Sequence, residues 1–588
     1  MDVLFDILMS PATKAKRSSS APPPLNKSHV LPLPAGLDNS KYNKLSSYFT
    51  VIQYKLVVYI IVGTITILLF IVYLLSGKLN NIAELSHTKQ LVSNRSPSND
   101  DINSLIQIEA HGTTDPNVVE SSNRISNADI DKLEQIKQSF LFAYHNYVDR
   151  CIDSDDLNPV DGTCTTWVGQ HNTLIDSLST LYIMNLTDEF NYASTYITNN
   201  MTIIDIDKNV SFFETTIRVL GGLLSAYSTT HNTLYMKKSV VLADRMLVAF
   251  DEHTGLPSSN VNLAQQTRST YDWSQGSVML AELGTFQLEY YYLTHVTGDI
   301  KYKQYADTVY QWFINNQSHS KDGLYPVHID TQHGTFKNQE YFMGGMADSF
   351  YEYLLKTWLL TGKTNNSLKQ LYLSAMSGIF RHMYHQAGHN AWLADITNGK
   401  HEKHQMQHLA CFIPGLLYLG VAHGVLSDQP ELEELHKSSA IKLTQTCYNM
   451  YTISSTGLAP ESVQFNPNTG DMSIVESSYK LRPEVLESIT ILYYLTGDQQ
   501  YRQMGWNIYQ SIEKYCRVQY GYSGLKSCND RLSYDNRMES YYFAETMKYL
   551  YLLFSDTNII RLTGEPGEYS VFNTEAHQLQ SWAAEEFG

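Results

Sequence analysis

A helical unit that recurs along the chain most strongly constrains how it can fold. An apolar helix, a short turn and a tyrosine-led helix follow one another near His231, Gly298, Gly362 and Gly497. The intervals are 67 residues (231 to 298), 64 residues (298 to 362) and 135 residues (362 to 497), and 135 is about twice 67. A unit of this length is a pair of helices, longer than a solenoid repeat. Because several such pairs can bury all their apolar faces by closing into a ring, we predict an all-α fold, an α/α barrel with apolar inner and amphipathic outer helices.

Acidic side chains occur inside these apolar helices. They are Glu214, Glu282, Asp348, Glu352, Glu484, Glu487, Glu539 and Glu545. Each acid taken alone is explained by a helix cap or a buried pair with arginine. A lone buried charge is costly, so the set as a whole indicates a polar, acidic pocket. Such pockets suit glycoside hydrolysis by paired carboxylates, or the binding of a hard cation by oxygen ligands.

One segment, residues 56–75, has 20 residues without a charge (LVVYIIVGTITILLFIVYLL), enough to cross a bilayer as a helix. The chain before it carries seven Lys or Arg against three Asp, which predicts that this end faces the cytosol. We predict a type II membrane protein. Its parts are a disordered cytosolic tail (1–55), a signal-anchor helix (56–75), a polar lumenal stem (76–130) and a globular body (131–583).

Net charge limits the partners of the body, and its sequons and cysteines agree with a lumenal location. The net charge of −17 argues against a general nucleic-acid binder, whose footprint is basic. Six of the seven Asn-X-Ser/Thr sequons and all six cysteines follow the apolar segment, where disulfides are permitted. Proximity in sequence suggests the bridges Cys151–Cys164 and Cys516–Cys528.

Three histidines, His401, His404 and His408, have a spacing loosely typical of metal ligands. No carboxylate or cysteine pattern brackets them, so we interpret the stretch HEKHQMQH as a polar loop. The sequence shows no zinc-type CxxC pair, no P-loop and no nucleotide-binding glycine motif.

Seven motifs, in order from Phe213 to His577, resemble those of the class I α-1,2-mannosidases of glycoside hydrolase family 47. They are FETTIRVLGGLLSAY, LAELGTFQLEY, ADSFYEYLLK, HLACFIPG, LRPEVLES, ETMKYLYLLFSD and VFNTEAH. The resemblance covers about residues 131–580. It implies an (α/α)7 barrel and the calcium-dependent, inverting removal of terminal α-1,2-linked mannose from Man9-type N-glycans. Its implied partners are high-mannose glycoproteins and the membrane, with no nucleic acid.

The resemblance also assigns residues by motif. It implies that Glu282, Asp348 and Glu484 are catalytic, with Glu484 the general base and either Glu282 or Asp348 the acid. Thr574 corresponds to the residue that binds Ca²⁺. Cys411 and Cys447 correspond to the family's disulfide. Further site-lining residues are Met346, Glu352, Glu461, Arg482, Glu487, Glu539 and Glu575.

Two positions depart from the pattern or discriminate within the family. Ser179 stands where the family usually has Asp, whereas Asp176 in the same motif is retained. Met346 is apolar where endoplasmic-reticulum members resemble one another in carrying Arg and Golgi members carry Leu. We therefore expect a Golgi-like enzyme that trims several mannoses, with the endoplasmic reticulum as the alternative location. The alternative function is a catalytically weak, mannosidase-like lectin of glycoprotein quality control.

Overall fold

The computed structural model describes residues 127–202 and 204–583. The predicted cytosolic tail (1–55), membrane-spanning helix (56–75) and stem up to residue 126, with its sequon at Asn94, lie outside the described residues. Helix α3 (Asn127–Cys151) begins four residues before the predicted body, with Asp129 in its first turn, where the helix dipole favours an acid. Within the described ranges, no helix is both long and apolar enough to cross a membrane.

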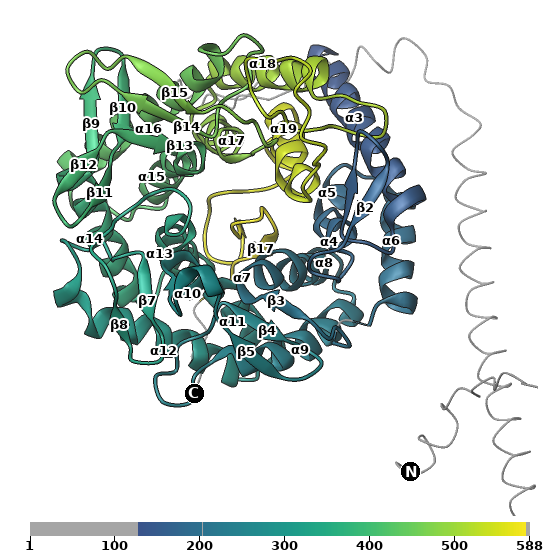
Figure 1. The fold of residues 1–588 in the computed structure, drawn as a ribbon, viewed down its shortest axis with the longest axis horizontal. Helices are drawn as coiled ribbons and strands as arrows, with labels where there is room; N and C mark the ends of the chain where they lie inside the picture. The colour runs from purple at the N-terminus through teal and green to yellow at the C-terminus, as the bar shows by residue number, and fades with distance from the viewer. Residues whose placement is uncertain (1–126, 203, 584–588) are drawn as a thin grey trace, which may run out of the picture. The chain divides into compact units, whose positions relative to one another are not determined.

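Two concentric rings of helices form the body (Figure 1). The inner ring consists of α5 (Leu178–Ile183), α8 (Gly221–Thr230), α11 (Gln287–Thr297), α13 (Asp348–Leu360), α15 (Ile413–Ala422), α17 (Glu484–Thr496) and α19 (Met547–Phe554). The outer ring consists of α3, α6 (Thr187–Asn200), α9 (Thr233–Met246), α12 (Lys301–Asn315), α14 (Asn366–His382), α16 (Pro430–Thr452) and α18 (Gln499–Tyr515). Each inner helix contacts the next, and α19 contacts both α5 and α3, which closes the ring. The described residues thus form seven helix pairs, as predicted.

Burial distinguishes the two rings. Residues 349–360 of α13 are all buried, so this inner helix is covered on every side. The outer helix α18 buries a stripe with the three- and four-residue spacing of an amphipathic helix, from Tyr501 through Met504 and Ile508 to Ile512. Gly298 and Gly497 end α11 and α17 in the left-handed conformation (φ 73° and 71°), which glycine adopts without steric cost. The predicted apolar inner and amphipathic outer helices are therefore confirmed.

Short helices connect the two rings or begin inner helices. They are α4 (Asn172–Asp176), α7 (Phe212–Glu214), α10 (Leu280–Gly284), the 3₁₀ helices η3 (Leu247–Ala249), η4 (Asp272–Ser274), η5 (Gln317–His319) and η6 (His408–Phe412), and the π-helical segments η2 (Thr215–Leu220) and η7 (Tyr542–Thr546).

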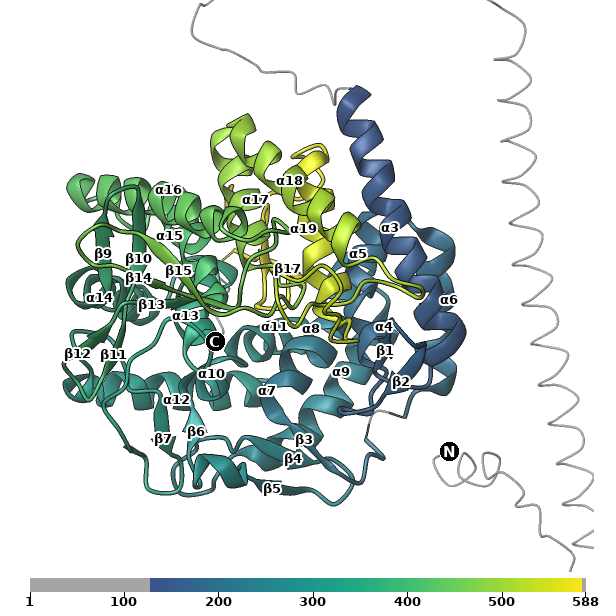
Figure 2. The same ribbon diagram turned by 45° about the horizontal axis from the view of Figure 1, so that its top comes forward.

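Short antiparallel strands make up the remaining connections (Figure 2). Four two-stranded sheets pair β1 (Asp156–Asn158) with β2 (Thr163–Thr165), β9 (Tyr384–Ala387) with β10 (Asn390–Leu393), β11 (Asp395–Thr397) with β12 (His401–Lys403), and β16 (Ser570–Phe572) with β17 (Gln578–Gln580). Three-stranded sheets join β3 (Asn209–Ser211), β4 (Asn260–Asn262) and β5 (Thr267–Ser269); β6 (Val278–Met279), β7 (His328–Asp330) and β8 (Thr335–Phe336); and β13 (Gln405–Gln407), β14 (Ser462–Phe465) and β15 (Met472–Glu476). The hairpin β16–β17 lies inside the ring, where its turn reaches the interior (Figure 1).

The described residues contain two disulfides. Cys411 is bonded to Cys447, as the family resemblance implies, and Cys151 is bonded to Cys164, as their proximity suggests. The predicted bridge between Cys516 and Cys528 is wrong, because both thiols are free and buried. Closeness in sequence did not bring these sulfurs together; each packs in the core as a small apolar side chain.

Candidate active site

A cavity of about 400 Å³ opens inside the ring of helices. Nine of the predicted site residues line it: Glu282, Met346, Asp348, Glu352, Arg482, Glu484, Glu487, Thr574 and Glu575. Glu461 and Glu539 are not among the lining residues. Glu461 pairs with Arg482 from behind, and Glu539 lies 3.9 Å from Arg537. The structure therefore gathers most of the predicted site, although its members are spread over 294 residues of sequence (282 to 575, both included).

Three of the lining carboxyls stand at the beginnings of helices. Asp348 is the first residue of α13, Glu484 is the first residue of α17, and Glu282 lies in the first turn of α10. The positive end of each helix dipole favours an acid at this position. In all three cases the carboxyl reaches the cavity from the first turn of a helix.

Glu282 is held by two hydrogen-bond donors. The backbone N–H of Met279 donates to its Oε2 at 2.9 Å, and the hydroxyl of Ser259 donates to the same oxygen at 2.8 Å. Burial raises the pKa of Glu282, and these two donors oppose that rise because they stabilise the charged form.

Asp348, unlike Glu282, accepts hydrogen bonds only from the next residue of its own helix among the described residues. Its Oδ1 accepts from the backbone N–H of Ser349 at 2.8 Å. Burial raises the pKa of Asp348 to about 7, and the nearby charges of Glu352 and Glu484 add to the effect. Near neutral pH a substantial fraction of this carboxyl is therefore protonated.

Glu484 is oriented by a histidine that the sequence analysis placed in a polar loop. The loop interpretation is wrong: residues 401–403 and 405–407 form strands β12 and β13, and His408 is buried in η6, directly before α15. Its Nδ1 lies 2.7 Å from Oε2 of Glu484, and its Nε2 lies 3.0 Å from the hydroxyl of Tyr451. With its proton on Nδ1, His408 donates to Glu484 and accepts from Tyr451. Two signals were available in the sequence: the apolar residues LACF that follow His408, and the family motif HLACFIPG, which His408 begins.

A second support for Glu484 comes from the residue two positions before it. Arg482 donates through Nε and Nη2 to both oxygens of Glu461 at 2.7–2.9 Å. This fork geometry fixes the guanidinium plane, and Nη1 of Arg482 then lies 3.9 Å from Oε1 of Glu484. Glu461 thus acts on the cavity through Arg482.

Two other cations balance acids deeper in the site. The buried Lys356 contacts Glu352 and lies 3.3 Å from Oε1 of Glu487. Arg218, in the π-helical segment η2, contacts Glu575 and donates through Nε to Glu214 at 2.7 Å. π-Helical turns often mark functional sites, and η7 likewise carries a lining acid, Glu545. The sequence analysis counted Glu214 and Glu545 among the acids in apolar helices, but it did not include them or Arg218 among the site residues.

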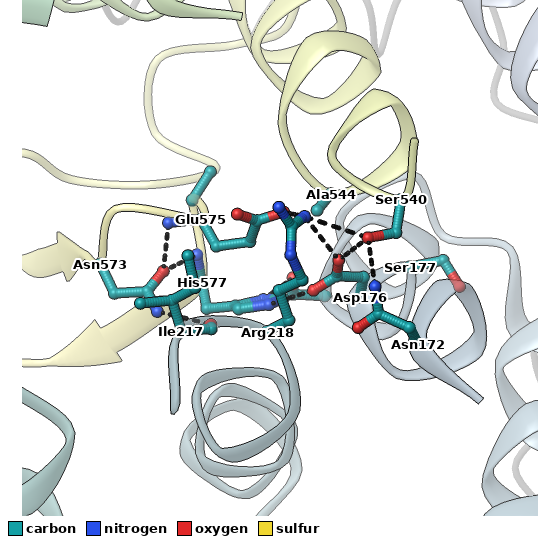
Figure 3. A network of polar contacts seen from close by, with 12 residues as sticks. Asn172, Asp176, Ser177, Ile217, Arg218, Ser540, Ala544, Asn573, Glu575 and His577 are labelled. Carbon is teal, nitrogen blue, oxygen red and sulfur yellow. Dashed lines mark hydrogen bonds and ion pairs between the residues drawn. The ribbon is translucent and has the colours of Figure 1, made fainter. Parts of the chain in front are cut away.

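Behind Arg218 lies a buried polar network (Figure 3). Nε2 of His577 lies 3.0 Å from Oδ1 of Asp176, and Arg218 approaches the other oxygen at 3.5 Å. The second ring nitrogen of His577 lies 3.2 Å from the hydroxyl of Ser179. Ser179, the position that departs from the family pattern, is therefore part of the support of the site and does not line the cavity.

Ser179 also contacts a buried lysine. Lys548 donates to Oγ of Ser179 at 2.8 Å and to the backbone carbonyl of Ala576. Neither partner carries a charge, and burial lowers the pKa of Lys548 to about 7. The contact with Ala576 ties Lys548 to the turn that carries Thr574.

Replacing Ser179 by aspartate should stabilise the folded chain, because the new carboxylate would pair with the buried ammonium group of Lys548. Below about pH 7, Lys548 is charged in both folded and unfolded states, and the folded state bears the full cost of the buried charge. Above about pH 7 the buried amine loses its proton, whereas an unfolded lysine keeps it until about pH 10.4, so the cost declines. We expect the free energy of unfolding to rise by about 1–3 kcal/mol near pH 6 and by less near pH 9, measured by urea unfolding. The gain should vanish in a Lys548→Met background; a gain that persists there contradicts the pairing.

The turn between β16 and β17 presents Thr574 to the cavity. Oδ1 of Asn573 accepts from the backbone N–H groups of Glu575 and His577 at 2.9 and 2.8 Å. Its Nδ2 donates to the backbone carbonyl of Ile217 and to Glu289, each at 2.9 Å. One buried asparagine thus fixes the turn from both sides.

The donor set of the cavity fits a hard divalent cation. Eight carboxyls line the cavity: Glu214, Glu282, Asp348, Glu352, Glu484, Glu487, Glu545 and Glu575. Only two lining residues, Arg218 and Arg482, are cationic. Burial raises the pKa of Glu487 to about 7 and raises those of Glu545 and Glu575 well above their ordinary value. A divalent cation held by oxygen atoms near Thr574 would offset this excess of buried acid.

Apolar side chains complete the walls. Tyr271, Trp273, Phe412, Leu409 and Tyr541 line the cavity beside the acids, together with Met346. Trp273 is 61% exposed and Met346 is 41% exposed, so both remain accessible to a large ligand. Tyr271 and Trp273 lie at a short connection with no helical periodicity, which is why the sequence analysis did not find them, whereas Phe412 and Tyr541 stand directly before longer helical segments.

Comparisons with known proteins identify the family of the chain. Residues 139–581 match glycosyl hydrolase family 47. The chain is 38% identical over 458 residues to the Arabidopsis thaliana mannosyl-oligosaccharide 1,2-alpha-mannosidase MNS1. This match covers 77% of this chain and 79% of that protein. It is 37% identical over 456 residues to the human endoplasmic reticulum mannosyl-oligosaccharide 1,2-alpha-mannosidase. This match covers 75% of this chain and 63% of that protein.

A solved structure gives the same result for the fold. The α-1,2-mannosidase from Trichoderma reesei superposes with a TM-score of 0.70 at 28% identity and covers 77% of this chain and 99% of that one. The matched region includes every helix of the inner ring. The chain therefore belongs to glycosyl hydrolase family 47 and is a glycoside hydrolase of the α-1,2-mannosidase class.

Proposed function

We propose that this chain removes terminal α-1,2-linked mannose from high-mannose N-glycans of the Man9 type, with inversion and with calcium as cofactor. The observation that carries the proposal is the convergence of Glu282, Asp348 and Glu484 with Thr574 on one acidic cavity. The substrate class follows from the relatives, which are named mannosyl-oligosaccharide 1,2-alpha-mannosidases. Release of free mannose from Man9 oligosaccharide by the full-length chain tests it. Tight binding without release would favour the lectin alternative.

An inverting glycosidase needs one carboxyl that protonates the leaving oxygen and one carboxylate that activates water. Asp348 fits the acid, because burial raises its pKa to about 7 and leaves it partly protonated at neutral pH. Glu282 fits less well, because two donors stabilise its charged form. We assign Glu282 to binding and positioning of the substrate beside the acid.

Glu484 fits the base. His408 and Arg482 hold its carboxylate in place from two sides, so that one oxygen can accept a proton from water as that water attacks the anomeric carbon. Glu484 takes one proton from the attacking water, and the proton on Asp348 passes to the leaving sugar oxygen as the glycosidic bond breaks. The aromatic walls, such as Trp273 and Phe412, offer apolar faces to the sugar ring.

Calcium is proposed as the cofactor because the lining donors are oxygen atoms and carboxyls outnumber cations. Thr574 would hold it through its hydroxyl and carbonyl oxygens, and Glu352, Glu487 and Glu575 lie in the same cavity wall. When bound, calcium would supply a fixed positive charge that holds sugar hydroxyls and water.

The activity should fall on the alkaline side with the pKa of Asp348. Because the acid acts in its protonated form, kcat/KM should decrease about tenfold per pH unit above about pH 7. The measurement is kcat/KM for Man9 oligosaccharide between about pH 5 and pH 9 at saturating calcium. A rate that stays constant from neutral pH to pH 9 would contradict the assignment of Asp348.

Met346 should influence which mannoses are removed. It has a left-handed backbone (φ 82°) at the cavity, and its thioether cannot donate hydrogen bonds. Replacing Met346 by Arg adds a fork of donors for oligosaccharide hydroxyls, so we expect trimming to stop after fewer mannoses. A timed digest resolved by product isomer measures this. Met346→Leu is the matched control and should leave the product pattern unchanged.

We also propose that the enzyme is a type II membrane protein whose body lies in the Golgi lumen, with the endoplasmic reticulum as the alternative. The apolar segment 56–75 supports the anchor. The five sequon asparagines within the described ranges are exposed or half-buried, as glycosylation requires: Asn185, Asn200, Asn209, Asn316 and Asn365. Protease protection of the body in intact microsomes, and its loss when residues 56–75 are deleted, tests the topology.

A further inference from the structure

A cluster of two imidazoles and one carboxylate lies outside the active-site cavity. One nitrogen each from His385 and His404 and one oxygen from Glu402 lie within 4.8 Å of one another. His385 is on β9, Glu402 is on β12, and His404 follows β12 directly. Figures 1 and 2 both show β9 to β12 at the outer edge of the ring, whereas the hairpin that carries Thr574 is at its centre. None of the three residues lines the active-site cavity.

The approach of His385 to Glu402 does not have the geometry of a hydrogen bond. Their Nε2 and Oε2 atoms are 3.2 Å apart. Yet Nε2 of His385 is closed to solvent and has no hydrogen-bond partner among the described residues. The carboxylate oxygen therefore lies beside the axis of the nitrogen lone pair. An unpaired buried nitrogen is unfavourable, so a partner that the described residues do not supply would stabilise it.

Two ligand atoms of one metal ion also lie close together without hydrogen-bond geometry between them. Their lone pairs point at a shared third position, and neither atom lies on the axis of the other. In a tetrahedral zinc site with ligand distances of about 2.0–2.2 Å, two ligand atoms are about 3.3–3.5 Å apart. The spacing between His385 and Glu402 is close to that value, and bringing His404 equally near requires a side-chain movement of at most about 1.5 Å.

The surroundings hold both imidazoles in place. The ring of His385 stacks on Trp392 with a centroid distance of 5.8 Å, and the ring of His404 meets His385 edge-on at 4.7 Å. Trp392 is fully buried and stacks in turn on Phe465 at 4.7 Å. Burial lowers the pKa of His385, so its imidazole is neutral near pH 7 and keeps the lone pair that a metal requires.

We propose that His385, Glu402 and His404 form a binding site for a divalent transition-metal ion of the zinc class, separate from the calcium site. Two imidazoles and a carboxylate match zinc, cobalt or nickel, whereas calcium prefers an all-oxygen shell. Water completes the coordination, because no fourth His, Cys, Asp or Glu joins the cluster in the described part of the chain. Bound metal would fasten the β9–β10 hairpin to the β11–β12 hairpin.

Trp392 provides an internal reporter. Its indole N–H donates to Nδ1 of His404 at 3.3 Å, a long hydrogen bond. An imidazole that binds metal through Nδ1 can no longer accept from the indole. One that binds through Nε2 carries its proton on Nδ1 and cannot accept either. In both cases Trp392 loses its acceptor, so metal binding should change its fluorescence.

The experiment uses the full-length chain, stripped with EGTA and returned to saturating CaCl2. Titration with Co²⁺ should produce the visible absorption of a low-symmetry site. Zn²⁺ should then displace it at one equivalent per chain, with a change in tryptophan emission. Removing either imidazole, by His385→Ala or His404→Ala, should weaken Zn²⁺ binding at least about 100-fold, because even second-shell changes weaken metal sites 10–100-fold.

His401→Ala is the matched control. His401 is exposed on the same strand, next to Glu402, and is not a member of the cluster, so this variant should bind Zn²⁺ like the wild type. Glu402→Gln, at an exposed position, serves if a histidine variant does not fold, and it should also weaken binding. Mannose release with calcium reports that each variant is folded. The proposal is overturned if stoichiometric Zn²⁺ binding is absent, or if it survives in the His385→Ala/His404→Ala variant.

Discussion

Replacing Glu484 by glutamine should lower kcat for mannose release from Man9 oligosaccharide by about 10³-fold, within the range for loss of a general base. Glutamine keeps the shape of the side chain and can still accept from His408 through its amide oxygen, so the fold should survive. What it loses is the ability to take a proton from water. KM should change little, because the change removes an interaction of the transition state.

Two comparisons make this result specific. Glu476→Gln removes a carboxylate from β15, at an exposed position outside the cavity, and should leave kcat unchanged. An α-mannosyl fluoride substrate has a leaving group that needs no proton, so it should restore turnover to Asp348→Asn but not to Glu484→Gln. If the fluoride rescued Glu484→Gln and not Asp348→Asn, the roles of the two carboxyls would have to be exchanged.

Removing calcium with EGTA should reduce turnover at least about 100-fold, since a bound metal ion contributes several kcal/mol of transition-state stabilisation. It should also lower the melting temperature, because eight carboxyls would then share one cavity with two arginines. At a free calcium concentration 100 times its Kd, the ion adds about 2.7 kcal/mol to the stability. Restoring CaCl2 should reverse both effects, as measured by mannose release and by differential scanning fluorimetry.

Thr574→Val tests where that ion binds. Valine preserves the shape of the threonine side chain but removes the hydroxyl oxygen, so the calcium concentration at half-maximal activity should rise. Thr456→Val is a suitable control, because Thr456 is buried far along the chain from the turn and contacts the carbonyl of Cys528. Full activity in EGTA, or an unchanged calcium requirement in Thr574→Val, would show that calcium is not held as proposed.

Much of the fold could be predicted because helical periodicity is a local property. The outer helix α18 shows its buried stripe in the spacing of Tyr501, Met504 and Ile508, and the inner helix α13 is apolar over most of its length. The number of helix pairs was less accessible, because the regular interval between turns is evident only for some of them. The resemblance to known motifs supplied that number, and the contacts that close the ring agree with it.

The candidate site was partly predictable for a different reason. Acids such as Asp348 and Glu484 stand out because a carboxylate in an apolar helix must have a partner or a polar cavity. His408 does not stand out, because a histidine in a polar stretch has many ordinary explanations. Only the approach of η6 to the beginning of α17 turns it into a partner of Glu484.

The sequence by itself determined which segments form helices, which faces of these helices are buried, and which carboxyls are too costly to bury alone. Local spacing carries this information, since a residue's neighbours along a helix are fixed at three and four positions. The tertiary structure alone decided which distant residues meet. It set Lys548 beside Ser179, left Cys516 and Cys528 apart, and brought His385 and His404 around one position. Such pairings depend on how the ring closes and how the connecting hairpins fold across its rim, and no short stretch of sequence encodes them.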